Sequence, residues 1–250
     1  MRSSRSIMLL LAAALFLVAA ACGCHIWREL HVRDMEQRTF EMLEDEVKKP
    51  EPALPENEHR RNQSEEVISH DCETLISANT DCIGWLTIPG TNVSYPVMWS
   101  PDEPERYLHR NFYGNYSDSG TPFLDARCDP ESGNLVIYGH NMISGTMFGS
   151  LRQFLQKSYL FEHRDVVLEM QNDTHHFEII CVATVENNDP WYCFLQSTSP
   201  AQLAETVSDL RERSRLKAGE LPLNGERLLT LSTCTGWTRS SRLILVAKEI

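Results

Sequence analysis

Short runs of apolar and β-branched residues, separated by turn residues, fill the chain from residue 84 to the C-terminus. This spacing predicts β-strands rather than helices. The predicted strands cover residues 84–88, 95–97, 121–125, 134–139, 166–170, 176–185, 228–233 and 243–248. Eight short strands in one region predict a mostly β fold, either a closed barrel or a sandwich.

Helical spacing of apolar residues interrupts the strand pattern in three places. The expected helices cover residues 67–76 behind a Ser64 cap, residues 147–156 and residues 200–219. The last of these has Ser199 as its N-cap, proline at the first helical position and Gln202 at the capping-box position. It lies in the long connection before the strand 228–233, so we expect that connection to be a helix-bearing loop.

The chain opens with two arginines, the second of them Arg5, and no charged residue follows until Arg28. About 20 apolar residues suffice to cross a bilayer as a helix, and the positive flank favours a cytoplasmic N-terminus. We therefore expect a single-pass cell-membrane segment over residues 1–27, with the rest of the chain extracellular. The alternatives are a cleaved signal peptide that ends near Ala21 and lipoprotein processing at Cys22.

Residues 28–49 are highly charged and carry only a partial apolar stripe, which predicts a marginal helix next to the membrane. The stripe consists of Leu30, Phe40, Leu43 and Val47. Three prolines between residues 50 and 55 break this helix and mark a linker. The predicted domains are a membrane segment over 1–27, a helix and linker over 28–63, and a folded domain over 64–250.

Composition and charge narrow the class of protein. A chain of 250 residues with 42% hydrophobic content can bury one good core, and its net charge of -12 argues against nucleic-acid binding. The eight cysteines show no metal-site spacing, and the adjacent His175 and His176 would point to opposite faces of a strand. We therefore expect no metal and no cofactor. The sequence leaves open a disulfide among Cys72, Cys82, Cys128, Cys181 and Cys193.

A candidate nucleophile stands at the end of a predicted strand, where Cys234 is followed eight residues later by Arg242. If the two strands pair, Arg242 returns beside Cys234, and its guanidinium favours the nucleophilic thiolate. His140 ends another strand across Gly139, a residue that permits a sharp turn. Three such side chains can converge on one cleft as nucleophile, general acid or base, and oxyanion donor. A structural cysteine near a surface arginine is the alternative.

These segments resemble the sortases, specifically class B. The resemblance rests on Thr230-Leu-Ser-Thr-Cys234 with Arg242, on Tyr138-Gly-His-Asn-Met142, and on residues 79–88, 91–97, 120–125 and 147–151. All parts occur in the family's order, and they cover about residues 70–250. The resemblance implies a mostly β fold, namely a closed eight-stranded sortase-type β-barrel with N-terminal helices and a helix-bearing loop before the catalytic-cysteine strand.

The resemblance also implies a membrane-anchored cysteine transpeptidase of a Gram-positive cell envelope. Cys234 would attack the threonine carbonyl of a C-terminal sorting motif and form a thioester, Arg242 would stabilise the oxyanion, and His140 would transfer protons. The implied partners are surface proteins with that sorting signal and an amine of the peptidoglycan cross-bridge or its lipid-linked precursor. A pilin-polymerising sortase, a secreted cysteine peptidase and a non-catalytic surface-binding barrel are the alternatives.

Further residues are candidates for binding the substrate. They are Ser232, Thr233, Tyr192, Phe194 and Asn141. The first two alternate along one strand, so one of them should face the cleft with the cysteine. The two aromatic residues lie in the loop that, in sortases, walls the groove for the sorting signal. Asn141 is, together with Asp125, also a candidate for orienting His140.

Overall fold

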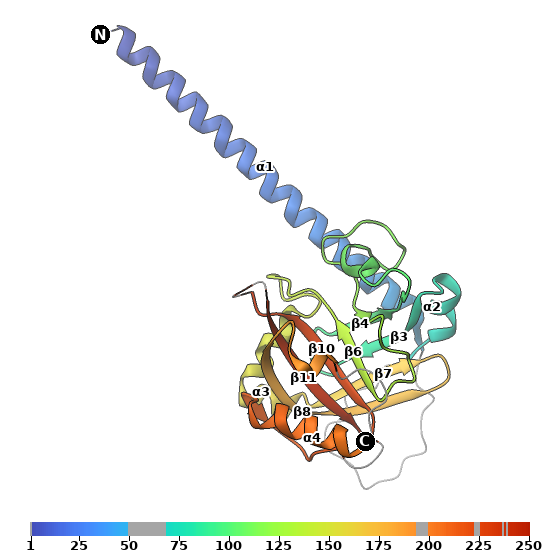
Figure 1. Ribbon diagram of the computed structural model, residues 1–250. Coiled ribbons are helices and arrows are strands. Elements are labelled where there is room, and N and C mark those ends of the chain that lie inside the picture. Colours follow the sequence, from blue (N-terminus) through green and yellow to red (C-terminus); the bar gives the residue numbers. More distant parts are fainter. Residues whose placement is uncertain (1, 50–68, 194–199, 223–225, 237, 239) are drawn as a thin grey trace, which may run out of the picture. The chain divides into compact units, whose positions relative to one another are not determined.

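The computed structural model describes residues 2–49, 69–193, 200–222, 226–236, 238 and 240–250 (Figure 1). Its contacts divide the chain into two compact units, Met1–Met42 and Leu43–Ile250. The predicted proline linker lies outside the described residues. The predicted domain boundaries therefore stay a prediction.

The first unit consists of most of helix α1 (Arg2–Val47). Among the described residues, no helix combines the length and the apolar character that a membrane span needs. The predicted single-pass localisation in the cell membrane is therefore wrong.

The second unit is built on a closed barrel of eight strands. The strands are β3 (Cys82–Thr87), β4 (Ser94–Met98), β5 (Phe123–Leu124), β6 (Asn134–Tyr138), β7 (Asp165–Met170), β8 (Thr174–Glu186), β10 (Leu228–Cys234) and β11 (Ser241–Glu249). They pair in the order β11-β10-β6-β5-β4-β3-β7-β8, and an additional pairing of β11 with β8 closes the sheet. The predicted mostly β barrel is confirmed, and each of its eight strands was expected from the sequence.

The strands stay close because their residues are small or apolar where neighbouring elements meet. In β10, the residues from Leu228 to Thr233 are all buried, a near-continuous run that is typical of a strand covered on both faces. At Gly84 in β3, an added Cβ would collide with the backbone carbonyl of Glu169 in β7. Only glycine permits that approach.

Three further strands and the short helices complete the second unit. They are β1 (Lys48–Lys49), β2 (Ser69–His70), β9 (Leu216–Lys217), α2 (Cys72–Ala78), α3 (Lys157–Glu162), α4 (Pro200–Glu212) and the 3-10 helices η1 (Arg106–His109), η2 (Gly149–Leu155) and η3 (Pro190–Cys193). β1 pairs with β2, and β9 extends the sheet beside β8. The predicted helix-bearing loop before the cysteine strand is confirmed, and its helix α4 packs on β8 (Figure 1).

Three helix predictions need correction. The helix expected over residues 147–156 is the 3-10 helix η2, followed by α3. α2 begins after Asp71, whose carboxylate accepts a hydrogen bond from the Thr74 N–H at 3.4 Å, rather than after Ser64, which lies outside the described residues. α4 begins at Pro200 as expected but ends before Gly219, because the chain turns into β9 to pair with β8.

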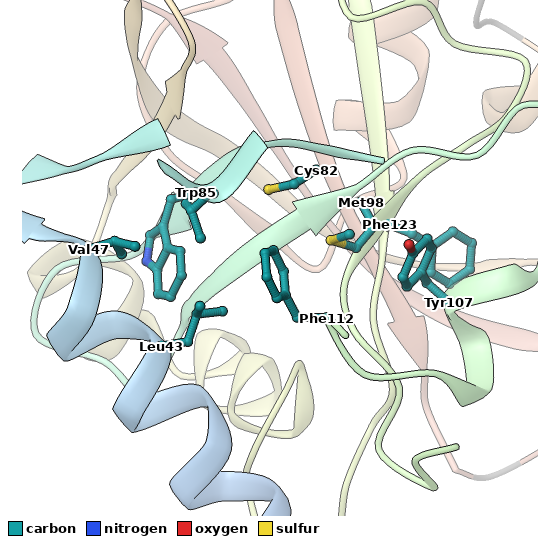
Figure 2. Packing of buried hydrophobic residues seen from close by; sticks show 9 residues of the cluster. Leu43, Val47, Cys82, Trp85, Met98, Tyr107, Phe112 and Phe123 are labelled. Atoms are coloured by element: carbon teal, nitrogen blue, oxygen red, sulfur yellow. The ribbon is translucent and has the colours of Figure 1, made fainter. Parts of the chain in front are cut away.

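One part of the core forms around Trp85, which is fully buried (Figure 2). Leu43 and Val47, from the last turns of α1, lie beside its indole, and Leu75 from α2 belongs to the same cluster. The rest of the cluster consists of Cys82, Met98, Tyr107, Phe112 and Phe123. The end of α1 is therefore part of the hydrophobic core of the second unit.

Candidate active site

Cys234 and Arg242 face each other beside the turn that joins β10 and β11. They are register partners in this antiparallel pair, and the predicted return of Arg242 beside Cys234 is confirmed. The Cys234 thiol is exposed. The Arg242 guanidinium donates from Nη1 to the Ser241 carbonyl at 3.3 Å. The sequence folds this way because β-rich runs flank a short turn that contains Gly236 with φ +80°.

His140 reaches the same end of the barrel because β6 runs parallel to β10, with Tyr138 paired to Ser232. The two chains stay joined beyond the strand, since the Gly139 N–H donates to the Ser232 carbonyl at 3.2 Å. Gly139 is needed for a reason that the sequence did not show. Its φ is not positive, but an added Cβ would lie 2.6 Å from the Phe148 ring.

The His140 ring is held by a backbone group. Its Nε2 lies 2.8 Å from the Leu108 carbonyl oxygen, and because a carbonyl only accepts, Nε2 must carry the proton. In the neutral ring, Nδ1 then has the free lone pair. Burial lowers the pKa of His140, and the electrostatic influence of His109, whose ring centroid lies 5.5 Å away, lowers it further, while the Leu108 hydrogen bond and Asp118 oppose this. The ring can therefore accept a proton near neutral pH.

A cavity of about 680 Å³ brings the three candidate catalytic residues together, since Cys234, His140 and Arg242 all line it. Its lining also includes Ser232, Thr233, Tyr192, Tyr138, Asp125, Arg127, Leu108 and Glu105. A cavity of this size lies within the range of about 300 to 1,000 Å³ that is typical of ligand-binding pockets.

The predicted substrate-binding residues differ in their surroundings. Ser232 and Thr233 both line the cavity, although alternation along the strand predicted only one of them there. The Tyr192 and Ser232 hydroxyls are hydrogen-bonded at 2.7 Å, and burial raises the pKa of Tyr192 to about 12. Phe194 lies outside the described residues. Asn141 directs its amide at the backbone of Cys234, with Nδ2 2.5 Å from the carbonyl oxygen.

Asp125 does not orient His140. Its carboxylate accepts hydrogen bonds from Arg127 at 2.7 Å and 3.0 Å and from the Tyr138 hydroxyl at 2.8 Å. Burial by itself would raise the pKa of Asp125, but the hydrogen bonds from Arg127 outweigh it and hold that pKa below its usual value. The group that holds the His140 ring is the Leu108 carbonyl, and a backbone carbonyl leaves no signal in a sequence.

The segment that carries Tyr192 is fixed by polar contacts that sequence reasoning also missed. The Trp191 indole N–H donates to the Thr230 hydroxyl in β10 at 3.2 Å. Asp189 is bound by both terminal nitrogens of Arg213, one of them at 2.8 Å, and these hydrogen bonds lower the pKa of Asp189. The wall of the cavity is therefore anchored to the cysteine strand and to the residue that follows α4.

The sortase domain model matches residues 86–250, which contain the whole cavity. This chain belongs to the sortase family. Over 169 residues, this chain is 30% identical to sortase B of Listeria monocytogenes. The alignment covers 67% of this chain and 68% of that relative. The predicted resemblance to class B is therefore confirmed.

Solved structures agree with this assignment. Sortase B of Clostridium perfringens is 30% identical with a TM-score of 0.66, across 71% of this chain and 98% of that one. Sortase B of Bacillus anthracis in complex with AAEK1 shares the fold, with 24% identity and a TM-score of 0.72 across 88% of this chain and 99% of that one. This sortase is accordingly a cysteine transpeptidase with a role in cell-wall anchoring, which acts on sorting-signal proteins and a cell-wall amine.

Proposed function

We propose that this sortase cleaves a C-terminal sorting motif after threonine, holds the product as a thioester on Cys234, and transfers it to a peptidoglycan amine. One observation carries the proposal. Cys234, His140 and Arg242 come from the ends of three neighbouring strands and line a single cavity. Nucleophile, proton carrier and oxyanion donor thus meet at one place, as acyl transfer requires.

The first half of the reaction uses the neutral His140 ring. Its Nδ1 takes the proton of the Cys234 thiol, and the thiolate attacks the threonine carbonyl. Arg242 donates hydrogen bonds to the oxygen that becomes negative. His140, now an imidazolium, gives its proton to the leaving amine, and the C–N bond breaks to leave the thioester.

The second half reverses these proton transfers. The amine of the peptidoglycan cross-bridge, or of its lipid-linked precursor, attacks the thioester while His140 accepts its proton. The proton returns to the Cys234 sulfur as the C–S bond breaks, and an amide is formed. Because the Thr235 N–H that follows the cysteine donates to the Ser241 carbonyl at 3.1 Å, we assign oxyanion stabilisation mainly to Arg242.

The test uses a library of peptides with glycine or asparagine after the threonine, incubated with and without hydroxylamine or triglycine. We expect cleavage after threonine and formation of the hydroxamate or glycine adduct, detected by mass spectrometry. Cys234→Ala is the control, since it removes the nucleophile and little volume, and it should abolish cleavage without lowering the melting temperature. Cleavage that persists in Cys234→Ala, or that yields only the hydrolysed acid at every amine concentration, contradicts the proposal.

A further inference from the structure

Asn141 connects the two residues that exchange a proton in the proposed reaction. It follows His140 directly in the chain, and its side-chain Nδ2 donates to the carbonyl oxygen of Cys234 at 2.5 Å. The hydrogen bond spans 93 positions of sequence. The backbone of the histidine and the backbone of the cysteine are therefore joined through one side chain.

This contact fixes the peptide group between Cys234 and Thr235 from both sides. Its carbonyl accepts from Asn141, while its N–H donates to the Ser241 carbonyl at 3.1 Å. Gly236 follows in the left-handed region with φ +80°, and a Cβ added there would lie 3.8 Å from the Asn141 Nδ2. A peptide plane that is held at both ends fixes the Cα atom from which the thiol extends.

The loop that carries Asn141 is itself firmly held. Asn141 forms a β-bridge with Met147, whose N–H donates to the buried Tyr95 hydroxyl at 3.0 Å. The Phe148 N–H donates to the His140 carbonyl at 2.9 Å. Because backbone groups and a buried side chain support this loop, the Asn141 amide is held rigidly against the backbone of Cys234.

The orientation of the amide is determined by its partner. A carbonyl oxygen only accepts, so Nδ2 and not Oδ1 must face Cys234. The Asn141 Oδ1 is buried and has no hydrogen-bond partner among the described residues. A buried unpaired oxygen costs stability, so this side chain is not explained by folding alone.

We propose that Asn141 is a positioning residue that aligns Cys234 with His140, and not a residue that binds the substrate. The proposal rests on the proposed function, because it takes Cys234 and His140 to be the reacting pair. A displacement of about 1 Å between reacting groups lowers rates by about 10²-fold. Loss of the Asn141 donor should therefore slow acylation while leaving peptide affinity almost unchanged.

The test compares Asn141→Asp and Asn141→Ala with the control Asn111→Asp in the full-length protein. Asn111 uses its Oδ1 to accept from the Tyr113 and Asn115 N–H groups, a role that aspartate keeps. We expect kcat for peptide cleavage to fall about 10- to 100-fold in both Asn141 variants, with KM changed less than about threefold and the melting temperature retained. The Asn111→Asp control should match the wild type.

A second measurement does not depend on any sorting peptide. Iodoacetamide alkylation of the Cys234 peptide, followed by mass spectrometry as a function of pH, reports its thiolate directly. Both Asn141 variants should shift this alkylation profile relative to the wild type, because the Cys234 thiol is no longer held in the same place relative to His140. Aspartate adds a charge that disfavours the thiolate, so the uncharged alanine variant must show the shift too.

Three outcomes overturn the proposal. A raised KM with kcat preserved would make Asn141 a substrate-binding residue, and losses that follow a lowered melting temperature would make it structural. An alkylation profile that stays unchanged in Asn141→Ala would show that Cys234 and His140 do not depend on it. If the wild type cleaves no sorting peptide, the proposed function fails, while the alkylation profiles still decide the role of Asn141.

Discussion

Cys234 and Arg242 are opposite each other in the register of β10 and β11, at the last residue of one strand and the second of the next. Directly opposite residues of an antiparallel pair point to the same face, with Cβ atoms about 5 Å apart. Both side chains accordingly line the same cavity. This arrangement allows two roles for the guanidinium, stabilising the thiolate or binding the oxyanion.

Substitutions at Arg242 separate these two roles. Lysine keeps the charge but loses the planar fork of donors, and alanine loses both. If Arg242 mainly binds the oxyanion, both variants should lower peptide turnover by about 10²- to 10³-fold. Alkylation of Cys234 by a small electrophile forms no tetrahedral oxyanion, so its rate should change far less.

The two rates should be measured side by side in the same preparations. Parallel losses of cleavage and alkylation in Arg242→Ala, with both restored in Arg242→Lys, would show that Arg242 acts on the thiolate instead. Arg152→Ala is a suitable control. It removes a guanidinium whose Nη2 lies near Gly236 in the same hairpin but which does not line the cavity.

The pH dependence of cleavage should follow the partly buried His140. Burial lowers the pKa of this ring, so the neutral, proton-accepting form persists below the ordinary value of about 6.5. We therefore expect kcat/KM to fall with acidification only below that pH. Asp118→Asn should move this limb to lower pH, since Asp118 raises the pKa, and His109→Gln should move it to higher pH.

The shifts of the acid limb in these two variants should be small, because burial is the main cause of the lowered pKa of His140. The pH profile of kcat/KM reports the free enzyme, and it is the measurement to make. Shifts of the two variants in the same direction, or an acid limb above pH 7, would show that another group controls the limb.

The barrel could be predicted from the sequence because its strands carry their signal locally, as in the short apolar and β-branched runs around Leu231 and Val167. The two-residue strands β1, β2 and β9 are too short for any periodicity. The end of α4 was also out of reach, because it depends on tertiary contacts. There the Arg211 guanidinium binds the carbonyls of Ala218 and Gly219, the latter at 2.6 Å.

The candidate site, like the fold, could be predicted only in part. Cysteine, arginine and histidine could be placed together because each stands at the end of a strand. Their supporting groups could not, since the Leu108 carbonyl comes from a distant loop and the partner of Asn141 is a backbone atom. The apolar N-terminal run predicted a membrane-spanning helix. That prediction was wrong, because no helix among the described residues is long and apolar enough.

Truncation of the N-terminus should separate the two compact units. We propose residues 64–250 as the catalytic domain, but Leu43 and Val47 are buried against Trp85. A chain that begins at residue 28 should keep the melting temperature and activity of the full-length protein. A chain that begins at residue 50 should be less stable by several kcal/mol, because burying one such side chain contributes about 1.5 to 3 kcal/mol.

Point variants check this interpretation in the intact chain. Leu43→Ala should cost about 2 to 5 kcal/mol in urea unfolding, whereas Met42→Ala, at an exposed position of the same helix, should cost little. Equal stability of the chains that begin at residues 28 and 50 would show that the end of α1 contributes nothing to the core.

The stability of the second unit should depend on pH through His70. This buried ring stacks on Trp85 with centroids 4.6 Å apart, its Nδ1 is bound to Glu169, and its backbone N–H donates to the same carboxylate at 2.9 Å. Burial by itself would lower the pKa of His70, but the hydrogen bond to Glu169 and the negative charge of Glu44, whose carboxylate lies 3.9 Å from Nε2, outweigh it, and the pKa is raised. The charged pair therefore stabilises the fold fully below about pH 6.5, and this contribution is lost as pH rises through the higher folded-state pKa.

Glu169→Gln removes the negative partner and leaves a buried positive charge, which costs about 3 to 5 kcal/mol when such a pair is broken. We expect that loss in urea unfolding at pH 6 and a smaller one at pH 9, because the charged pair contributes less as the pH rises. Glu178→Gln is the matched control, because Glu178 pairs with Arg164 at 2.9 Å in a more exposed position and should cost at most about 1 kcal/mol at either pH. A loss in Glu169→Gln that is the same at pH 6 and pH 9, or larger at pH 9, would mean that His70 is not charged in the folded protein.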